Sequence, residues 1–306
     1  MDFIVVLNQI AVLFILIVVG FMLKKLKILD DRFEKGLAGL IISVTLPALI
    51  ITSMNYEFSK ELLGNSLMIL GYGASTFALM ILVSYIFSKI FHLENPQKGV
   101  YQFLIVFPNT GFIGFPILNA VFGREAIFYA SIFNVIFNIL LWTLGVYFVS
   151  KKKKKINFNM LINPGTVSVV VGFMLFVLSI ELPYIIHSSL QTIGDTTTPL
   201  AMIMVGLLLG DARFRVLFKN IKLFVISVIR LIIIPLIVYI MLSLFKLPQI
   251  VLATVVILSG MPSGANAAIF SRKFESDYKL ASQGIFLTTL LSIASIPLII
   301  YIVINF

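Results

Sequence analysis

The chain has 306 residues, of which 60% are hydrophobic and 12% charged, and its formal net charge is +10. This composition lies far from that of a soluble globular domain and predicts an integral membrane protein. The absence of cysteine excludes disulfides, thiolate catalysis and cysteine metal sites. Because the lysines gather in short loops between apolar runs, we attribute the basic balance to orientation in a membrane rather than to nucleic acid binding.

Apolar runs of membrane-spanning length recur along the chain, since a membrane helix needs about 20 such residues. The first run lacks the basic leader and the small-residue cleavage site of a signal peptide, so we expect a retained helix. The pattern predicts ten transmembrane helices. They lie at about residues 3–23, 34–54, 62–90, 98–122, 126–149, 162–181, 190–210, 221–245, 248–271 and 281–304.

Basic residues concentrate in alternate loops. The odd-numbered loops hold almost all of them, including the run Lys151–Lys155, whereas the even-numbered loops hold only Lys60, Arg124 and Lys246. Positively charged loops stay in the cytoplasm, so both termini should be extracytoplasmic. The Lys151–Lys155 run is interpreted as a solvated, orienting linker or, alternatively, as a patch for anionic lipid.

Two prolines recur at nearly the same offset in the two halves of the chain. Pro47 and Pro108, in the second and fourth runs, correspond to Pro199 and Pro262 in the seventh and ninth. Because each half holds an odd number of helices, the second half should be inverted in the membrane, as in many secondary transporters. We therefore predict a first five-helix repeat, a basic cytoplasmic linker and a second, inverted repeat at 1–150, 151–161 and 162–306.

Helix-breaking residues interrupt the fourth and ninth runs, at Pro108–Pro116 and Gly260–Asn266. Proline removes a backbone donor and clashes with the preceding turn, and glycine weakens the helix further. Irregular backbone at membrane depth is tolerated only where protein or a wet cavity surrounds it. We therefore expect helices 4 and 9 to be broken and to cross near the midplane, where transporters of this architecture bind their substrates.

The motif Pro-Asn-Thr-x3-Gly-x-Pro, from Pro108 to Pro116, resembles the fourth-helix motif of the auxin efflux carrier family, which includes the plant PIN carriers and bacterial permeases for malate or malonate. The resemblance implies ten helices, outward termini and organic anion transport, in a PIN-like or bile-acid-transporter-like fold. Only a short lysine run replaces the hydrophilic middle region of the plant carriers, and a serine follows Pro262 where they have glutamine, which argues against auxin itself. Similar elements are Pro262-Ser263-Gly264, Arg230-Leu231 with Pro235, and Gly194-Asp195 with Pro199.

At each predicted break the second half-helix begins with unpaired amides, which carry roughly half a positive charge and attract anions. Asn109 and Thr110, or Ser263, are expected to act as N-caps that a substrate carboxylate supplements. Alternatively, the breaks only allow two helices to cross. The predicted substrate-binding residues are Pro108, Asn109, Thr110, Gly111, Gly114, Pro262, Ser263, Gly264, Asn266, Asn134 and Asn138.

Polar residues within spans are candidates for function. Asp195, near the outer end of the seventh run and beside Thr198, is interpreted either as a coupling group or as an N-terminal helix cap. Arg230 is expected to reach the membrane interface or to pair with Asp211, with substrate contact as the alternative. Asn134 and Asn138, one turn apart, either line a cavity or join helices. All three of Asp195, Thr198 and Arg230 are candidates for coupling or gating.

These features predict a secondary transporter that moves a small organic anion, a carboxylate of the malate or malonate kind, across the cytoplasmic membrane by alternating access. A sodium-coupled symporter of the bile-acid type and a non-transporting anion sensor are the alternatives. No enzyme, metal site, cofactor or nucleic acid partner is expected, although Na+ or H+ is a candidate coupling ion. The expected partners are the anion and the lipid bilayer, with a homodimer suggested by related folds.

Overall fold

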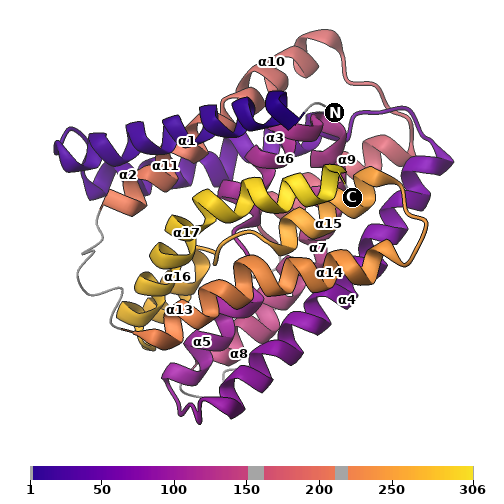
Figure 1. The fold of residues 1–306 in the computed structure, drawn as a ribbon. Helices are drawn as coiled ribbons and strands as arrows, with labels where there is room; N and C mark the ends of the chain where they lie inside the picture. Colours follow the sequence, from indigo (N-terminus) through magenta and orange to yellow (C-terminus); the bar gives the residue numbers. More distant parts are fainter. Residues whose placement is uncertain (1–2, 151–161, 211–219, 306) are drawn as a thin grey trace. The chain divides into compact units, whose positions relative to one another are not determined.

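The structure is a computed structural model that describes residues 3–150, 162–210 and 220–305. Over these residues the chain forms helices and no β-strand, as predicted (Figure 1). Seven helices in this part of the chain are long and apolar enough to cross a membrane, and three shorter apolar helices accompany them. The ten predicted runs all coincide with helical segments, but their arrangement as an inverted repeat stays a prediction.

Helices of the first half follow the predicted runs closely, and three of them contain a π-helical turn (η). They are α1 (Phe3–Lys25), α2 (Asp31–Leu40), η1 (Ile41–Thr45), α3 (Leu46–Ser53), α4 (Lys60–Ile90), α5 (Gln97–Val106), η2 (Thr110–Gly114), α6 (Phe115–Phe122), α7 (Arg124–Leu140), η3 (Leu141–Gly145) and α8 (Val146–Val149).

Four helices of the second half begin directly after a residue that is typical of helix starts. Asn163 and Asn220 cap α9 and α13 through their side chains, and Pro183 and Pro248 precede α10 and α15. The elements are α9 (Pro164–Val177), α10 (Tyr184–Asp195), α11 (Thr197–Gly210), α13 (Ile221–Val228), η5 (Ile229–Ile233), α14 (Ile234–Ser243), α15 (Gln249–Ser259), α16 (Asn266–Lys273) and α17 (Tyr278–Asn305).

Three of the π-helical turns end two residues before a proline, at Pro47, Pro116 and Pro235. Proline offers no amide to the carbonyl four residues earlier. In two of the turns the carbonyl of the first residue accepts a hydrogen bond from the amide of the fifth residue beyond it, and an α-helix that contains the proline follows each turn directly. Helix α17 shows another outcome, because it stays helical around Pro297. Proline alone therefore does not interrupt these helices.

The chain divides into two compact units, each assembled from three stretches. Unit 1 comprises Met1–Leu70, Gly111–Val135 and Leu161–Asp211, and unit 2 comprises Gly71–Thr110, Ile136–Met160 and Ala212–Phe306. These units are defined by contacts, whereas the halves 1–150 and 162–306 follow from recurring motifs. The division into sequence halves stays a prediction.

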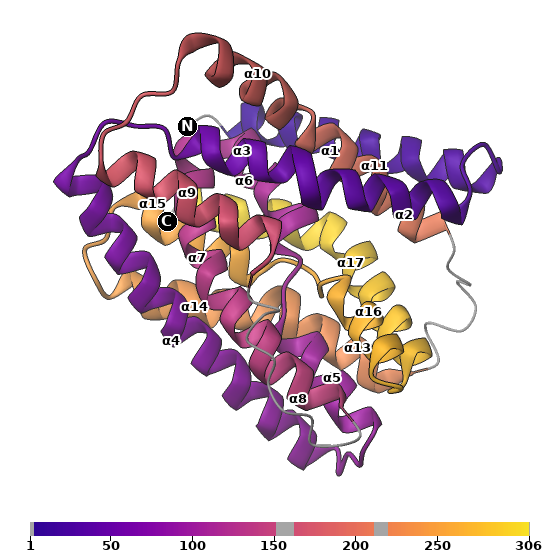
Figure 2. The same ribbon diagram turned by 180° about the vertical axis from the view of Figure 1, so that it is seen from behind.

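Within unit 1, the principal helix pair is α1 with α11, and α3 packs against both α9 and α10 (Figure 2). Gly20 faces the backbone of Ile203, and Gly206 faces the backbone of Ile17, each so closely that an added Cβ would collide. Small residues let membrane helices approach to backbone contact, which is how they gain packing energy in lipid. Glycine therefore sets the α1–α11 contact.

Within unit 2, aromatic rings fill the space around α5. Phe103 and Phe107 lie with their ring centroids 4.6 Å apart, and Phe107 meets Phe137 edge to face at 5.9 Å. Gly99 and Gly284 let α5 approach Phe148 and α17, respectively. This packing holds the end of α5 in place, directly before Pro108.

Candidate functional site

The first interruption follows α5. The helix ends at Val106, and Phe107 adopts an extended conformation with φ −104° and ψ 103°. Its amide still bonds the carbonyl of Phe103 at 3.0 Å, but Pro108 has no amide to offer the carbonyl of Leu104. Helical structure resumes as the π-turn η2 at Thr110. The last carbonyls of α5 therefore need donors from elsewhere.

The second interruption separates α15 from α16, between Ser259 and Asn266. At the end of α15 the Gly260 amide donates a hydrogen bond to the Val256 carbonyl at 3.1 Å, and Pro262 again removes a donor. Both interruptions fall where proline and glycine cluster in the sequence.

The two interruptions pair with each other through backbone hydrogen bonds inside unit 2. The Asn109 amide donates to the Pro262 carbonyl at 2.7 Å, and the Gly264 amide donates to the Phe107 carbonyl at 2.9 Å. Pro108 and Ser263 thus face each other in an isolated antiparallel bridge. Backbone groups freed by one interruption are satisfied by the other, which is what burial of irregular backbone requires. Gly264 permits this approach, because an added Cβ would lie 3.0 Å from the Pro108 oxygen.

Ser263 satisfies a further carbonyl. Its hydroxyl donates to the Leu104 oxygen at 2.7 Å, the carbonyl that Pro108 cannot reach, while its amide donates to the Thr288 hydroxyl at 3.1 Å. The Ser263 side chain is fully buried. The prediction that Ser263 caps the second half-helix is wrong: Ala265 occupies the N-cap of α16, and no side chain caps it. Ser263 lies instead in the bridge, where its hydroxyl donates to the Leu104 carbonyl.

Arg230 contacts both interruptions. Its Nε donates to the Met261 carbonyl at 3.0 Å, and its Nη1 donates to the Ile105 carbonyl at 2.9 Å and lies 3.4 Å from the Met80 sulfur. The side chain has no exposed surface, so the expected reach to the membrane interface is wrong. The proposed partner Asp211 lies outside the described residues. Arg230 turns inward because unsatisfied carbonyls at the interruptions lie within its reach.

The remaining predicted binding residues differ in how deeply they are buried. Asn109 and Thr110 are buried next to the bridge, whereas Asn266 is half-buried at the start of α16. The prolines 108 and 262 are buried, and so is Gly114, while Gly111 is half-buried. On α7, Asn134 is buried and Asn138 half-buried. The hydrogen bonds of the two interruptions join Asn109, Pro262, Ser263, Gly264 and Arg230 into one network.

Asp195 belongs to a separate feature of unit 1. It is the last residue of α10, and its carboxylate accepts a bond from Arg124 Nη2 at 2.6 Å. It lies at the junction of two helices, because α10 begins at Tyr184, directly after Pro183, and α11 begins two residues after Asp195, at Thr197. Both side chains are partly exposed, at 28% for Arg124 and 54% for Asp195. Thr198 lies half-buried in the first turn of α11.

Sequence reasoning misses several polar pairs. Asn65 donates to the Tyr129 hydroxyl at 3.0 Å in unit 1, and Asn220 donates to the Tyr101 hydroxyl at 3.1 Å in unit 2. It also treats Arg124 only as a loop charge. A polar residue within an apolar run is a signal for such bonds, but the partner far along the chain carries no signal of its own.

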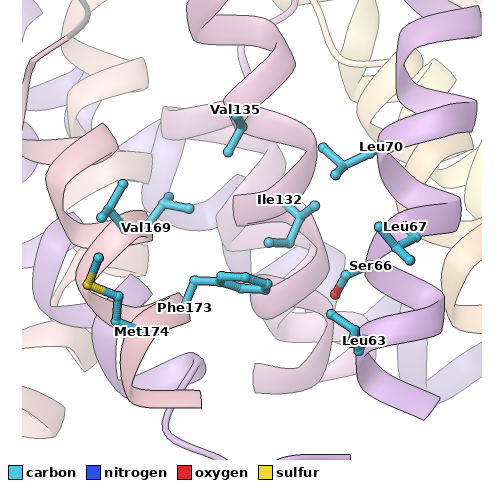
Figure 3. A pocket seen from close by; sticks show the side chains of 10 residues that line it. Leu63, Ser66, Leu67, Leu70, Ile132, Val135, Val169, Phe173 and Met174 are labelled. Carbon is cyan, nitrogen blue, oxygen red and sulfur yellow. The ribbon is translucent and has the colours of Figure 1, made fainter. Parts of the chain in front are cut away.

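A cavity of about 280 Å³ lies in unit 1 between α4, α7 and α9 (Figure 3). Its lining is aliphatic and aromatic apart from Ser66, and it includes none of the predicted binding residues. Such a lining suits a hydrocarbon and offers no cation or cluster of amides to a carboxylate. Among the residues that the structure describes, no group of His, Asp and Glu side chains is arranged to hold a metal ion.

Comparison with known proteins covers nearly the whole chain. An uncharacterized transporter of Methanocaldococcus jannaschii is 25% identical over 98% of this chain and 99% of its own length. Another uncharacterized transporter, from Methanothermobacter thermautotrophicus, is 24% identical over 93% of this chain and 94% of its own length. The model of the membrane transport protein family matches residues 5–160 and 153–300. The chain therefore belongs to the membrane transport protein family, the auxin efflux carrier family that its proline motifs resemble.

Proposed function

We propose that this protein is a secondary transporter that moves a small organic anion, a carboxylate of the malate or malonate kind, across the cytoplasmic membrane. Family membership and the names of the relatives support a transporter rather than an enzyme. Apolar helices of spanning length support a multi-pass membrane protein. The substrate class and the transport mechanism are our proposal.

The pairing of the two interruptions is the observation that carries this proposal. Each interruption supplies an amide to a carbonyl of the other, so the ends of four half-helices converge on one bridge. Such convergence needs two helix breaks placed to match, which a single proline kink does not provide. Secondary transporters build their substrate and ion sites from half-helix ends in this way.

The polarity of the half-helix ends favours an anion. No side chain caps the amide end of α16, and Asn266 in its first turn is only half-buried. The amide end of a helix carries roughly half a positive charge, and asparagine adds neutral donors. Arg230 adds a full charge to the same network, and among the described residues no carboxylate forms an ion pair with it. A bound carboxylate would meet a positive potential here.

The transport cycle in this proposal is alternating access by ten helices in two inverted repeats, with both termini outside the cell. One group of helices moves against the other and exposes the paired interruptions to each side in turn. Asn266, which is half-buried, is the proposed first contact of the substrate, with Asn109 and Thr110 next to the bridge as further contacts. The Arg124–Asp195 pair is a candidate gate, since it is accessible and held by one charge-assisted bond.

The test is transport of radiolabelled malonate and malate by purified protein in proteoliposomes. Asn109→Ala and Asn266→Ala remove only side-chain amides and leave the backbone bridge in place, so both should lower the initial rate several-fold in a folded protein. Asn305→Ala is the matched control, because Asn305 is exposed and its side-chain amide donates to the Tyr301 carbonyl within its own helix. Wild-type rates in both site variants would refute the assigned site. Binding without flux in the wild type would identify a sensor.

A further inference from the structure

The two carbonyls that Arg230 binds lie close to the carbonyl ends of α5 and α15. Ile105 lies in the last turn of α5, where carbonyls lack helical partners, and Met261 follows the end of α15. The amide that would bond the Ile105 carbonyl in a continuous helix belongs to Asn109, and it bonds Pro262 instead. The carbonyl end of a helix carries roughly half a negative charge. Arg230 therefore lies where two negative helix ends converge.

Two converging carbonyl ends of helices form a site that favours a coupling cation. In secondary transporters, carbonyl ends of interrupted helices coordinate Na+. A guanidinium is a permanent cation with five donors in a rigid planar fork, so it satisfies several carbonyl oxygens at once. Here one guanidinium reaches a carbonyl of each interruption through a different nitrogen, at 3.0 and 2.9 Å.

Arg230 is held in this position from its own helix. It lies in the π-turn η5, which ends two residues before Pro235, and it has no exposed surface. Its third contact is the uncharged sulfur of Met80, and no carboxylate neutralises it in the part of the chain that the structure describes. Burying a charge is costly unless it is paired or hydrogen-bonded. The two carbonyl contacts of Nε and Nη1 are therefore its principal compensation, while its buried Nη2 has no partner among the described residues.

We propose that Arg230 is a tethered cation that occupies a sodium-like position at the carbonyl ends of both interrupted helices, so that this protein neither binds Na+ there nor needs a sodium gradient. The consequence for coupling rests on the proposed transport function. The claim about cation binding does not, because it concerns the folded protein alone.

The first experiment measures thermal unfolding of the purified protein in detergent, in NaCl and in choline chloride at equal ionic strength. Wild-type protein should unfold at the same temperature in both salts. Arg230→Gln removes the charge and leaves the carbonyls accessible, so it should unfold at a lower temperature and be stabilised by Na+ in a saturable manner. Arg230→Lys, which retains a cation, should show no sodium-specific shift.

Arg124→Gln is the matched control, because it removes a partly exposed arginine outside unit 2 and should gain no response to Na+. A saturable sodium-specific shift in the wild type would overturn the proposal, and so would a folded Arg230→Gln variant that ignores Na+. If Arg230→Gln does not fold, a saturable sodium-specific shift in the wild type or in Arg230→Lys would still overturn the proposal.

The second experiment measures malonate uptake by wild-type proteoliposomes with Na+ or choline outside, and equal initial rates are expected. A rate that falls when Na+ is replaced would overturn the sodium independence of transport. Absence of flux in either salt would count against the proposed function, while the unfolding temperatures continue to decide whether Arg230 replaces a bound ion.

Discussion

The two units of this protein bring helices together by opposite physical means. In unit 1, α1 and α11 meet through Gly20 and Gly206, where the absence of a side chain allows backbone contact. In unit 2, two interrupted helices meet through hydrogen bonds among Asn109, Ser263 and Arg230 and the carbonyls opposite them. The first contact depends on shape and the second on satisfying polar groups. In a membrane no water replaces a lost hydrogen-bond partner, so removing a single polar side chain should destabilise the second contact more than a single change destabilises the first.

The largest effect should come from Arg230→Met, which removes the donors to the Ile105 and Met261 carbonyls. Each buried carbonyl left without a partner costs about 1–3 kcal/mol, so the loss of unfolding free energy should be about 2–6 kcal/mol. Chemical denaturation of the purified protein measures it. The stability of Arg230→Lys should lie between those of the wild type and Arg230→Met, since lysine retains the charge but not the planar set of guanidinium donors. Wild-type stability of the methionine variant would show that these contacts are dispensable.

Gly206→Ala should disrupt the shape-dependent contact, because the new methyl would collide with the backbone of Ile17 and Phe21. Overpacking of this kind costs about 1–3 kcal/mol. Gly64→Ala is the matched control in the same unit: nothing lies within 4 Å of the position its methyl would take, and alanine favours the helix by about 1 kcal/mol over glycine. The two substitutions should therefore shift the thermal unfolding temperature in opposite directions, and shifts of the same sign would contradict close packing at Gly206.

Ser263→Ala should have a smaller effect than Arg230→Met. It deletes one bond, from the hydroxyl to the Leu104 carbonyl, and leaves the backbone bridge with Pro108 in place. The expected loss is about 1 kcal/mol, as for a typical buried hydrogen bond. Ser282→Ala, which removes a half-buried hydroxyl bonded to Tyr278 within its own helix, provides the comparison. Equal losses in the two variants would mean that the bond to Leu104 contributes nothing beyond local helix effects.

The smallest effect is expected for Asp195→Asn, which neutralises one member of the Arg124 pair. Both side chains are partly exposed, so the pair should contribute less than about 1 kcal/mol to stability. A double-mutant cycle with Arg124→Gln measures the coupling, which should shrink further at high salt. If Asp195→Asn nevertheless abolishes transport without altering stability, the pair acts in gating or coupling rather than in folding.

Local signals predicted much of the helical pattern. The clusters around Pro108 and Pro262 mark the places where α5 and α15 end, and Asn163 and Asn220 precede helices as good caps do. Local signals do not reveal that a helix, α10, precedes Asp195 and ends there, although Pro183 directly before Tyr184 is a typical helix-start residue. They also gave Ser263 the role of a cap, since a serine before a helix usually has that role.

Partners distant in the chain were not predictable in the same way. Arg230 lies 125 residues from Ile105 and 31 from Met261, and Ser263 lies 159 residues from Leu104. Nothing in the composition around Arg230 distinguishes a side chain that reaches toward the interface from one that turns inward. The decisive factor is a set of carbonyls without donors, which exists only once both interruptions have formed.

The amino-acid sequence by itself determined that this chain is helical, apolar enough for a membrane and interrupted at two proline-rich sites, because hydropathy and backbone chemistry act over neighbouring residues. The tertiary structure decided that the two interruptions share their backbone hydrogen bonds, that Ser263 replaces the amide Pro108 lacks, and that Arg230 binds both helix ends. The physical reason is that a buried carbonyl accepts whichever donor the fold brings within about 3 Å, and separation along the chain places no limit on that choice.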